Sequence, residues 1–221
     1  YNIHHGRGMD DRVDLERIAQ VILDEGADIV ALQEGDVGME RTDGVDIARE
    51  LAELTGMEHV VFGSNLEIQG GEYGTATLSR FPIVEHENSH FEQLGPEQRG
   101  VLQTMIDVDG RSLLMINTHL DYRGDDNSER MLYIRETRDR ILPAWDSEAI
   151  IYAGDFNDVP GSDVHRELKG YMSDVWESVG SGDGFTIPVN TPNRRIDWIF
   201  YDDGVEPLRA CVPVTQASDH L

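Results

Sequence analysis

Apolar residues recur at helical spacing across residues 10–25 of this chain. They are Leu15, Ile18, Ala19 and Ile22. Asp10 or Asp11 stands before this predicted helix as a candidate cap. A continuous apolar run at 27–33 then predicts a strand buried on both faces, with Glu34 at its C-terminal end.

After a second predicted helix at 45–54, the pattern changes to short strands punctuated by Gly-Gly, Phe-Pro and Asp-Gly. These strands are expected at 60–62, 73–78, 83–86, 101–108 and 112–116. Helices at 130–142 and 164–168 follow, with strands at 149–153, 195–201 and 205–214. This order predicts an α+β fold in which two mixed sheets pack face to face with helices outside, a four-layer α/β/β/α sandwich. We expect one domain over residues 1–221.

Composition narrows the class of protein. With 221 residues and 39% hydrophobic content, the chain has the makeup of one soluble globular domain, with a monomer favoured. No apolar run approaches the roughly 18–20 residues that span a bilayer, and no leader pattern opens the chain. Strand character begins at once and the chain ends on Ser-Asp-His-Leu, so we expect it to be trimmed at both ends. Cys211 is the only cysteine, which excludes an intrachain disulfide.

The net charge of −25 would argue against a nucleic-acid partner in dilute buffer. However, Lys169 is the only lysine among 18 basic residues, beside 43 acidic ones. Loss of lysine together with an acidic excess favours adaptation to concentrated salt, where the Debye length falls to about 3 Å. An arginine-biased genome would explain the missing lysine but not the charge. The charge therefore describes the solvent, favours a salt-rich cytoplasm and leaves the partner open.

Polar residues stand where several predicted strands end, which is a poor place for unpaired carboxylates. They are Asn2 in N-I-H-H, Glu34 in L-Q-E, His119 in N-T-H-L-D, Asp155 and Asn157 in G-D-F-N-D, Asp197 in R-I-D-W-I-F, and Asp219 and His220 in S-D-H. Singly, each has a structural explanation, such as a satisfied core histidine or an ion pair with a neighbouring arginine. Together they suit convergence around a hard metal ion.

In this order the motifs resemble those of the endonuclease/exonuclease/phosphatase superfamily, which includes pancreatic-type deoxyribonucleases, apurinic endonucleases, neutral sphingomyelinases and inositol polyphosphate 5-phosphatases. The resemblance runs from Asn2 to His220. It implies a metal-dependent phosphoester hydrolase. The Gly-Asp-Phe-Asn motif, followed by Ile-Asp-Trp-Ile-Phe and Ser-Asp-His, is its most specific part.

The resemblance also implies a role for each residue. Glu34 would be the principal ligand of Mg²⁺ or Mn²⁺, supported by Asn2 and Asp219. Asp155 with Asn157 would orient and deprotonate the attacking water. His119 would donate to the phosphoryl oxygens, and Asp197 would orient His220, which carries a proton near neutral pH. The resemblance therefore implies five catalytic residues: Asp155, Asn157, His119, Asp197 and His220.

Arginines on segments that leave these strand ends are candidates for gripping substrate phosphate. Arg41 and Arg123 are the two candidates, although a plain surface charge explains either. Glu97 is a candidate hydrogen-bond partner of His119, with a solvated loop acid as the alternative. Arg80, Tyr73 and Trp198 are given structural roles. None of these residues identifies a substrate.

Subfamily signals are mostly missing, and the motifs look most like a small hydrolase branch similar to the C-terminal domain of certain lipid-remodelling proteins. The first hypothesis is a phosphodiesterase acting on a nucleic acid, a lipid head group or a small diester. The second is a phosphomonoesterase on a sugar or inositol phosphate. A binding module without turnover is the third. The loops at 35–44, 88–98, 122–129 and 178–194 are expected to decide the substrate.

Overall fold

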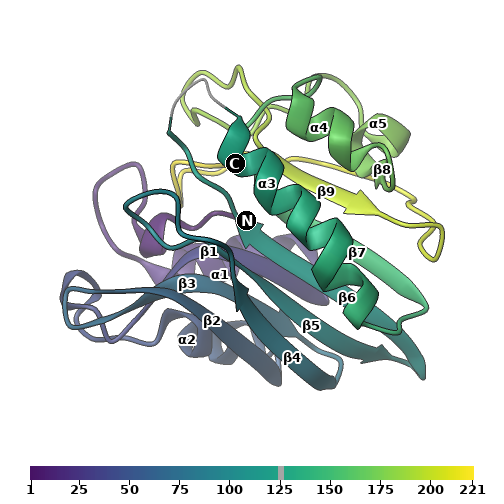
Figure 1. Cartoon of the computed structure of the whole chain (residues 1–221). Coiled ribbons are helices and arrows are strands. Elements are labelled where there is room, and N and C mark those ends of the chain that lie inside the picture. The colour runs from purple at the N-terminus through teal and green to yellow at the C-terminus, as the bar shows by residue number, and fades with distance from the viewer. Residues whose placement is uncertain (124–126) are drawn as a thin grey trace.

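Two β-sheets packed face to face form the centre of the protein (Figure 1). The computed structural model describes residues 1–123 and 127–221. A three-stranded antiparallel sheet has the order β1-β3-β2, from β1 (Ile29–Val37), β3 (Gly71–Ser79) and β2 (His59–Ile68). A six-stranded mixed sheet has the order β4-β5-β6-β7-β9-β8. Its strands are β4 (Ile83–His90), β5 (Gly100–Val108), β6 (Arg111–His119), β7 (Ala149–Asp155), β9 (Asp197–Tyr201) and β8 (Ser173–Asp174).

Helices cover the outer faces of both sheets (Figure 1). On the three-stranded sheet, α1 (Leu15–Glu25) and α2 (Ile47–Thr55) bury one face against strand residues such as Leu32 and Leu78. On the six-stranded sheet, α3 (Ser128–Glu136) and α4 (Asp163–Leu168) pack with Tyr152 and Phe200. A short α5 (Val175–Val179) follows β8. The predicted four-layer α/β/β/α sandwich is confirmed.

The layer between the sheets mixes small apolar residues with directional polar contacts. Ala31, Met115 and Ala153 pack there. Asn117 of β6 is fully buried, and its Nδ2 donates to the carbonyls of Leu32 at 3.0 Å and Ala76 at 2.8 Å on the opposite sheet. Hydrogen bonds of this kind from a side-chain amide set the alignment of the two sheets, because buried polar groups must be paired.

The two ends of α1 are capped by an aspartate and a glycine. Asp14 caps α1 by accepting from the Arg17 N–H at 3.0 Å, so the helix begins later than predicted and neither Asp10 nor Asp11 caps it. Gly26 ends α1 with a positive φ of 63°, which a glycine adopts without strain. Among the described residues, no helix is both long and apolar enough to cross a membrane.

The predicted strand at 205–214 is wrong, because the structure has no strand after β9. Pro207 and Pro213 lack the N–H that a ladder needs. Leu208 and Val214 are 86% and 93% exposed, so this segment lacks the burial that drives strand formation. The C-terminal chain instead runs as irregular structure to His220.

Candidate active site

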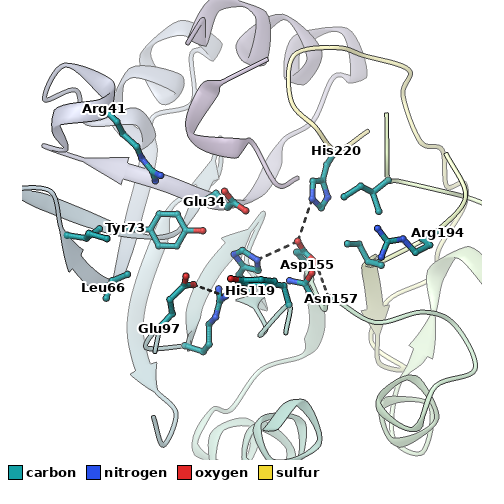
Figure 2. A pocket seen from close by; sticks show the side chains of 15 residues that line it. Glu34, Arg41, Leu66, Tyr73, Glu97, His119, Asp155, Asn157, Arg194 and His220 are labelled. Carbon is teal, nitrogen blue, oxygen red and sulfur yellow. Dashed lines mark hydrogen bonds and ion pairs between the residues drawn. The ribbon is translucent and has the colours of Figure 1, made fainter. Parts of the chain in front are cut away.

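A cavity of about 470 Å³ opens where the two sheets meet (Figure 2). The three-stranded sheet contributes Glu34 and Tyr73 to its lining, and the six-stranded sheet contributes His119 and Asp155. His220 reaches the same cavity from the irregular C-terminal segment. Residues nearly two hundred positions apart in the chain therefore face one space.

Asp155 is the centre at which the polar side chains converge (Figure 2). Its Oδ2 accepts from Asn2 Nδ2 at 3.0 Å and lies 3.5 Å from His119 Nε2 and 3.7 Å from His220 Nε2. Its Oδ1 accepts from the backbone N–H of Asn157 at 2.9 Å. The residue is only 1% exposed, so its contacts are made inside the protein and not in bulk water.

Burial and the charge of Asp197 raise the pKa of Asp155 to about 7, although His220, Asn2 and the Asn157 N–H oppose the shift. A carboxyl whose pKa lies near neutral pH can exchange a proton under physiological conditions. Asp155 is thus suited to act as a proton acceptor. This is unusual for an aspartate, whose ordinary pKa is 3.8.

His220 is held by a carboxylate on its other side. Its Nδ1 lies 2.9 Å from Asp197 Oδ2 at the start of β9. Burial disfavours the imidazolium, but the charges of Asp197, Asp155 and Asp219 outweigh burial and raise the pKa of His220 to about 9. His220 therefore carries a proton at neutral pH, and Asp197 fixes which ring nitrogen faces Asp155.

His119 stands in the opposite protonation state. Burial, reinforced by the positive charge of Arg99, holds the pKa of His119 well below its usual value. Among the described residues, its buried Nδ1 has no hydrogen-bond partner. Glu97 pairs with Arg99 at 2.8 Å, so the structure does not place it as the partner of His119. His119 thus faces Asp155 as a neutral imidazole.

Glu34 reaches the cavity through a β-bulge. The pairing of β1 with β3 shifts register between Gln33 and Gly35, and Glu34 adopts a left-handed φ of 64°. Its Oε1 accepts from Asn2 Nδ2 at 3.0 Å, so Asn2 links Glu34 to Asp155. The expectation that Glu34 stands at the C-terminal end of the strand is wrong, because β1 continues to Val37 and the bulge redirects the side chain.

Arg41 lines the cavity on the side of Tyr73. Its Nε and Nη2 each donate to a carboxylate oxygen of Asp36 at 2.7 Å, and the Asp36 side chain is fully buried. The guanidinium also lies 5.6 Å from the centre of the Tyr73 ring. This two-pronged grip fixes Arg41 at the edge of the cavity.

The sequence profile of the Endonuclease/Exonuclease/phosphatase family matches residues 1–220. The chain belongs to this family. An uncharacterized protein of Escherichia coli K12, YbhP, is 27% identical over 233 residues that span 99% of this chain and 90% of that protein. Family membership makes a phosphoesterase or nuclease-type hydrolase the class of enzyme to which the chain is related.

Solved structures of the family share this fold. An endonuclease/exonuclease/phosphatase from Beutenbergia cavernae superposes with a TM-score of 0.80 at 25% identity, covering 99% of this chain and 67% of that one. A mannosyl-6-phosphatase from Bacteroides thetaiotaomicron superposes with a TM-score of 0.73 at 19% identity, covering 93% of this chain and 87% of that one. The second likeness shows the fold alone.

A divalent ion is typical of this family, and the donor set here fits a hard cation. Glu34 and Asp155 share the Asn2 amide, while Asp155, Asp197 and His220 bring ligand atoms within 4.8 Å of one another. Oxygen donors dominate, and Cys211, an exposed thiol, is not among the residues that line the cavity. One buried oxygen, Oδ1 of Asp197, has no hydrogen-bond partner in the described part of the chain. This chemistry suits a hard divalent cation.

The cavity lining lacks four of the sequence-predicted residues, Asn2, Asp197, Asp219 and Arg123. Asn2 and Asp197 still contact the lining residues Asp155 and His220, whereas Asp219 and Arg123 turn to other partners. Asp219 has a side chain 45% exposed, and its Oδ1 lies 3.7 Å from His4 Nδ1. Arg123 pairs with Asp121 and Glu129, and it is not among the described residues that line the cavity. Of the loops expected to decide the substrate, 122–129 extends over 124–126, outside the described residues.

Sequence reasoning assigned no site role to several residues of the cavity wall, among them Tyr73 and Arg99. Tyr73, which was given a packing role, lines the cavity, and burial followed by the charge of Glu34 raises the pKa of its hydroxyl well above the usual value. Arg99 also lines the cavity but belongs to no motif. The only signal for it was a lone arginine directly before a strand. Trp198, by contrast, packs as predicted, 1% exposed and stacked on Phe156.

Proposed function

We propose that the protein is a divalent-metal-dependent phosphoester hydrolase that cleaves by in-line attack of water, most simply a phosphodiesterase of the nuclease type. The observation that carries this proposal is the convergence of Asn2, His119 and His220 on Asp155, in a cavity that Glu34 also lines. A proton acceptor, a protonated imidazole and a neutral imidazole lie around one space. A proton acceptor, a proton donor and a hydrogen-bond donor to phosphoryl oxygen each accelerate the hydrolysis of a phosphoester.

Each residue has a role that follows from its state. Asp155 takes a proton from water, since its pKa is raised to about 7 by burial and by Asp197. Asn157 holds Asp155 through its backbone N–H. His220, with its pKa raised to about 9 by nearby carboxylates despite burial, donates a proton toward the leaving oxygen, and Asp197 keeps it oriented. His119 donates a hydrogen bond to a phosphoryl oxygen.

Glu34 is the proposed principal ligand for Mg²⁺ or Mn²⁺, with Asn2 and Asp219 as supporting candidates. The ion, when bound, would act as a Lewis acid that neutralises charge on the phosphoryl group. Asn2 donates to Glu34 and Asp155 while its Oδ1 accepts from the His4 N–H at 3.1 Å, so ligation through oxygen requires the amide to turn over. Of the two supporting residues, Asn2 lies between the carboxylates, whereas Asp219 pairs with His4.

The substrate is a phosphoester: a nucleic acid, a lipid head group or a small diester. A phosphomonoesterase acting on a sugar or inositol phosphate is the second candidate, and a mannosyl-6-phosphatase with the same fold favours keeping it. A module that binds without turnover is less well supported, because every expected polar position is filled. Arg41 supports either enzyme as a group that contacts substrate phosphate.

A two-substrate assay separates these possibilities. Purified protein in Mg²⁺ and multimolar KCl is given bis-p-nitrophenyl phosphate or p-nitrophenyl phosphate. Turnover of the diester alone supports the phosphodiesterase, and turnover of the monoester alone contradicts it in favour of the second candidate. Absence of turnover with both esters and with either Mg²⁺ or Mn²⁺ would leave only the binding module.

We also propose that the protein works in concentrated salt, as a monomer in a salt-rich cytoplasm. The basis is the charge of −25, with one lysine, Lys169, among 221 residues. Screening at high salt removes the self-repulsion that this charge creates. Urea melts in low and multimolar KCl test the idea, and equal stability in both would rule it out.

A further inference from the structure

Arg99 is a nearly buried cation in the wall of the cavity. Only 4% of the residue is exposed, yet it lines the cavity beside His119 and Tyr73. Its backbone is fixed, because its carbonyl accepts from the Phe91 N–H at 3.0 Å and from Gln98 Nε2 at 2.7 Å. The guanidinium therefore projects from a rigid point just before β5.

The bonding of Arg99 is weaker than that of comparable arginines in this chain. Arg41 grips both oxygens of Asp36, and buried Arg195 grips both oxygens of Asp174. Arg99 makes one ion pair, from Nη2 to Glu97 at 2.8 Å, and its buried Nε, like that of Arg195, has no hydrogen-bond partner among the described residues. A guanidinium carries five N–H donors in a fork that matches two oxygens of one anion.

Glu97, the partner of Arg99, is easily displaced. Its side chain is 37% exposed, and it also lines the cavity, as the close-up shows (Figure 2). An ion pair with one half-exposed member is weak, since water competes for the carboxylate. A phosphate group that enters the cavity offers the fork two oxygens where Glu97 offers one contact.

The scarcity of positive charge around the cavity gives a second reason to assign Arg99 to the phosphate. The protein has a net charge of −25, and the cavity contains the carboxylates of Glu34, Glu97 and Asp155. Among the described residues that line it, the arginines are Arg41 and Arg194 besides Arg99. Arg41 is held by both oxygens of Asp36, so its attraction for a phosphate anion is reduced, and Arg99 adds a second, buried cation in the same cavity.

We propose that Arg99 is a substrate-binding residue that holds two non-bridging oxygens of the phosphate group, and that Glu97 is the counterion that this phosphate displaces. The inference rests on the proposed function, because it places the phosphate in the same cavity. A diester has two non-bridging oxygens and a monoester has three, so both can fill this fork and the shared ligand is the phosphate group itself.

Direct binding of inorganic phosphate tests the inference without turnover. Isothermal titration in Mg²⁺ and fixed KCl compares the wild type with Arg99→Gln, Arg99→Lys and Glu97→Gln. We expect Arg99→Gln to weaken phosphate binding by about 10- to 100-fold, the range for loss of a charge-assisted hydrogen bond. Arg99→Lys keeps the charge but loses the forked donor geometry, so its phosphate affinity should lie between those of the wild type and Arg99→Gln. Glu97→Gln removes the competitor and tightens binding.

Opposite signs separate a binding role from a structural one. If the ion pair only supports the fold, Arg99→Gln and Glu97→Gln change phosphate affinity in the same direction, and the inference is overturned. Unchanged affinity in Arg99→Gln, or a wild type that binds no phosphate, overturns it as well. Arg80→Gln is the control, because Arg80 pairs with Asp28 and does not line the cavity. Melting curves identify any variant that fails to fold.

Ester assays on the same variants keep the two proposals apart. Kinetics with bis-p-nitrophenyl phosphate and p-nitrophenyl phosphate show which ester depends on Arg99, and the expected effect is a raised KM. Phosphate binding that depends on Arg99, without turnover of either ester, would overturn the proposed function and keep this inference. Turnover that is indifferent to Arg99→Gln would overturn this inference and keep the function.

Discussion

Two clusters of histidine and carboxylates lie along the six-stranded sheet, and they differ in what neutralises them. Asp155, Asp197 and His220 form one, and His165, Asp174 and Glu177 form the other. Each brings its ligand atoms within 4.8 Å of one another. By residue type and spacing the two are alike.

The second cluster is completed by the protein itself. Asp174 accepts from both terminal nitrogens of Arg195, at 3.2 and 2.8 Å, and from His165 Nε2 at 2.8 Å. His165 also packs edge-on against Trp198, 5.1 Å between ring centres. His165 and Asp174 are therefore buried and neutralised where α4, β8 and β9 meet, while Glu177 of α5 is exposed.

No arginine or lysine in the described part of the chain forms an ion pair with Asp155 or Asp197. As a result, the pKa values of two aspartates shift in opposite directions, although burial raises both. The pKa of Asp155 rises to about 7 through burial and the charge of Asp197. The pKa of Asp174 falls to about 2, because His165 and Arg195 outweigh burial. The difference teaches that uncompensated charge beside a cavity distinguishes a site from a structural junction.

The largest expected difference is in turnover. His220→Ala is expected to lower kcat by about 10³-fold, because a positioned proton donor contributes on that scale, while phosphate binding is retained. His165→Ala is the matched control and should leave kcat per folded molecule unchanged. Steady-state kinetics on folded protein make the measurement. Equal losses in both variants would remove the distinction between the clusters.

For the free energy of unfolding we expect the opposite order, with the larger loss in the neutralised cluster. Asp174→Asn leaves Arg195 buried without its carboxylate, so the free energy of unfolding should fall by about 3 kcal/mol. The wild-type contribution of Asp174 is present above the ordinary aspartate pKa and is lost as pH falls toward 2, because its folded pKa is lowered to about 2 by His165 and Arg195 against burial. Urea melts from pH 7 down to pH 3 measure both effects. A variant as stable as wild type would show that the junction contributes little.

Metal dependence should distinguish the two carboxylate sets next. Glu34→Gln removes the proposed principal ligand, so half-saturation of activity should need at least about tenfold more Mg²⁺. Glu177→Gln, in the neutralised cluster, is the control and should leave the Mg²⁺ requirement unchanged. Activity titrated with Mg²⁺ after chelation gives the two curves. If they coincide, Glu34 is not the ligand.

The smallest expected effect concerns Asp155 in metal-free protein. Since burial and Asp197 raise its folded pKa to about 7, its contribution to stability is complete below the ordinary aspartate pKa and is lost as pH rises through 7. Asp155→Asn should therefore be more stable than wild type at pH 8, by about 1–2 kcal/mol, and the gap should close at pH 4. Melts in EDTA across this range test the sign. A variant that is less stable at pH 8 contradicts it.

Much of this site was predictable because its residues lie in regular elements with ordered motifs. Asp155 and His119 end neighbouring strands, so parallel pairing of β6 and β7 places them together. The four layers followed from helical and strand periodicity for the same reason. Periodicity failed at 205–214, where apolar residues alternate but find no neighbouring strand.

Other features depend on tertiary contacts that no local pattern carries. Glu34 faces the cavity because of a bulge at a positive φ, a conformation that glutamate rarely adopts. Arg99 lies in a loop and acquires its place only when β5 joins the sheet. Asp219 was placed by motif alone, yet its neighbour His220 takes the cavity position while Asp219 turns to His4.

Asn117 ties the sheets together beneath the cavity, and Glu34 and Asp155 lie on different sheets. Apolar contacts alone would let the sheets slide, because they have no direction, and salt alters their strength. The hydrogen bonds from the Asn117 side chain to the carbonyls of Leu32 and Ala76 allow one alignment of the two sheets. The distance between the Glu34 and Asp155 carboxylates should therefore stay constant from dilute buffer to multimolar salt, even where the melting temperature changes.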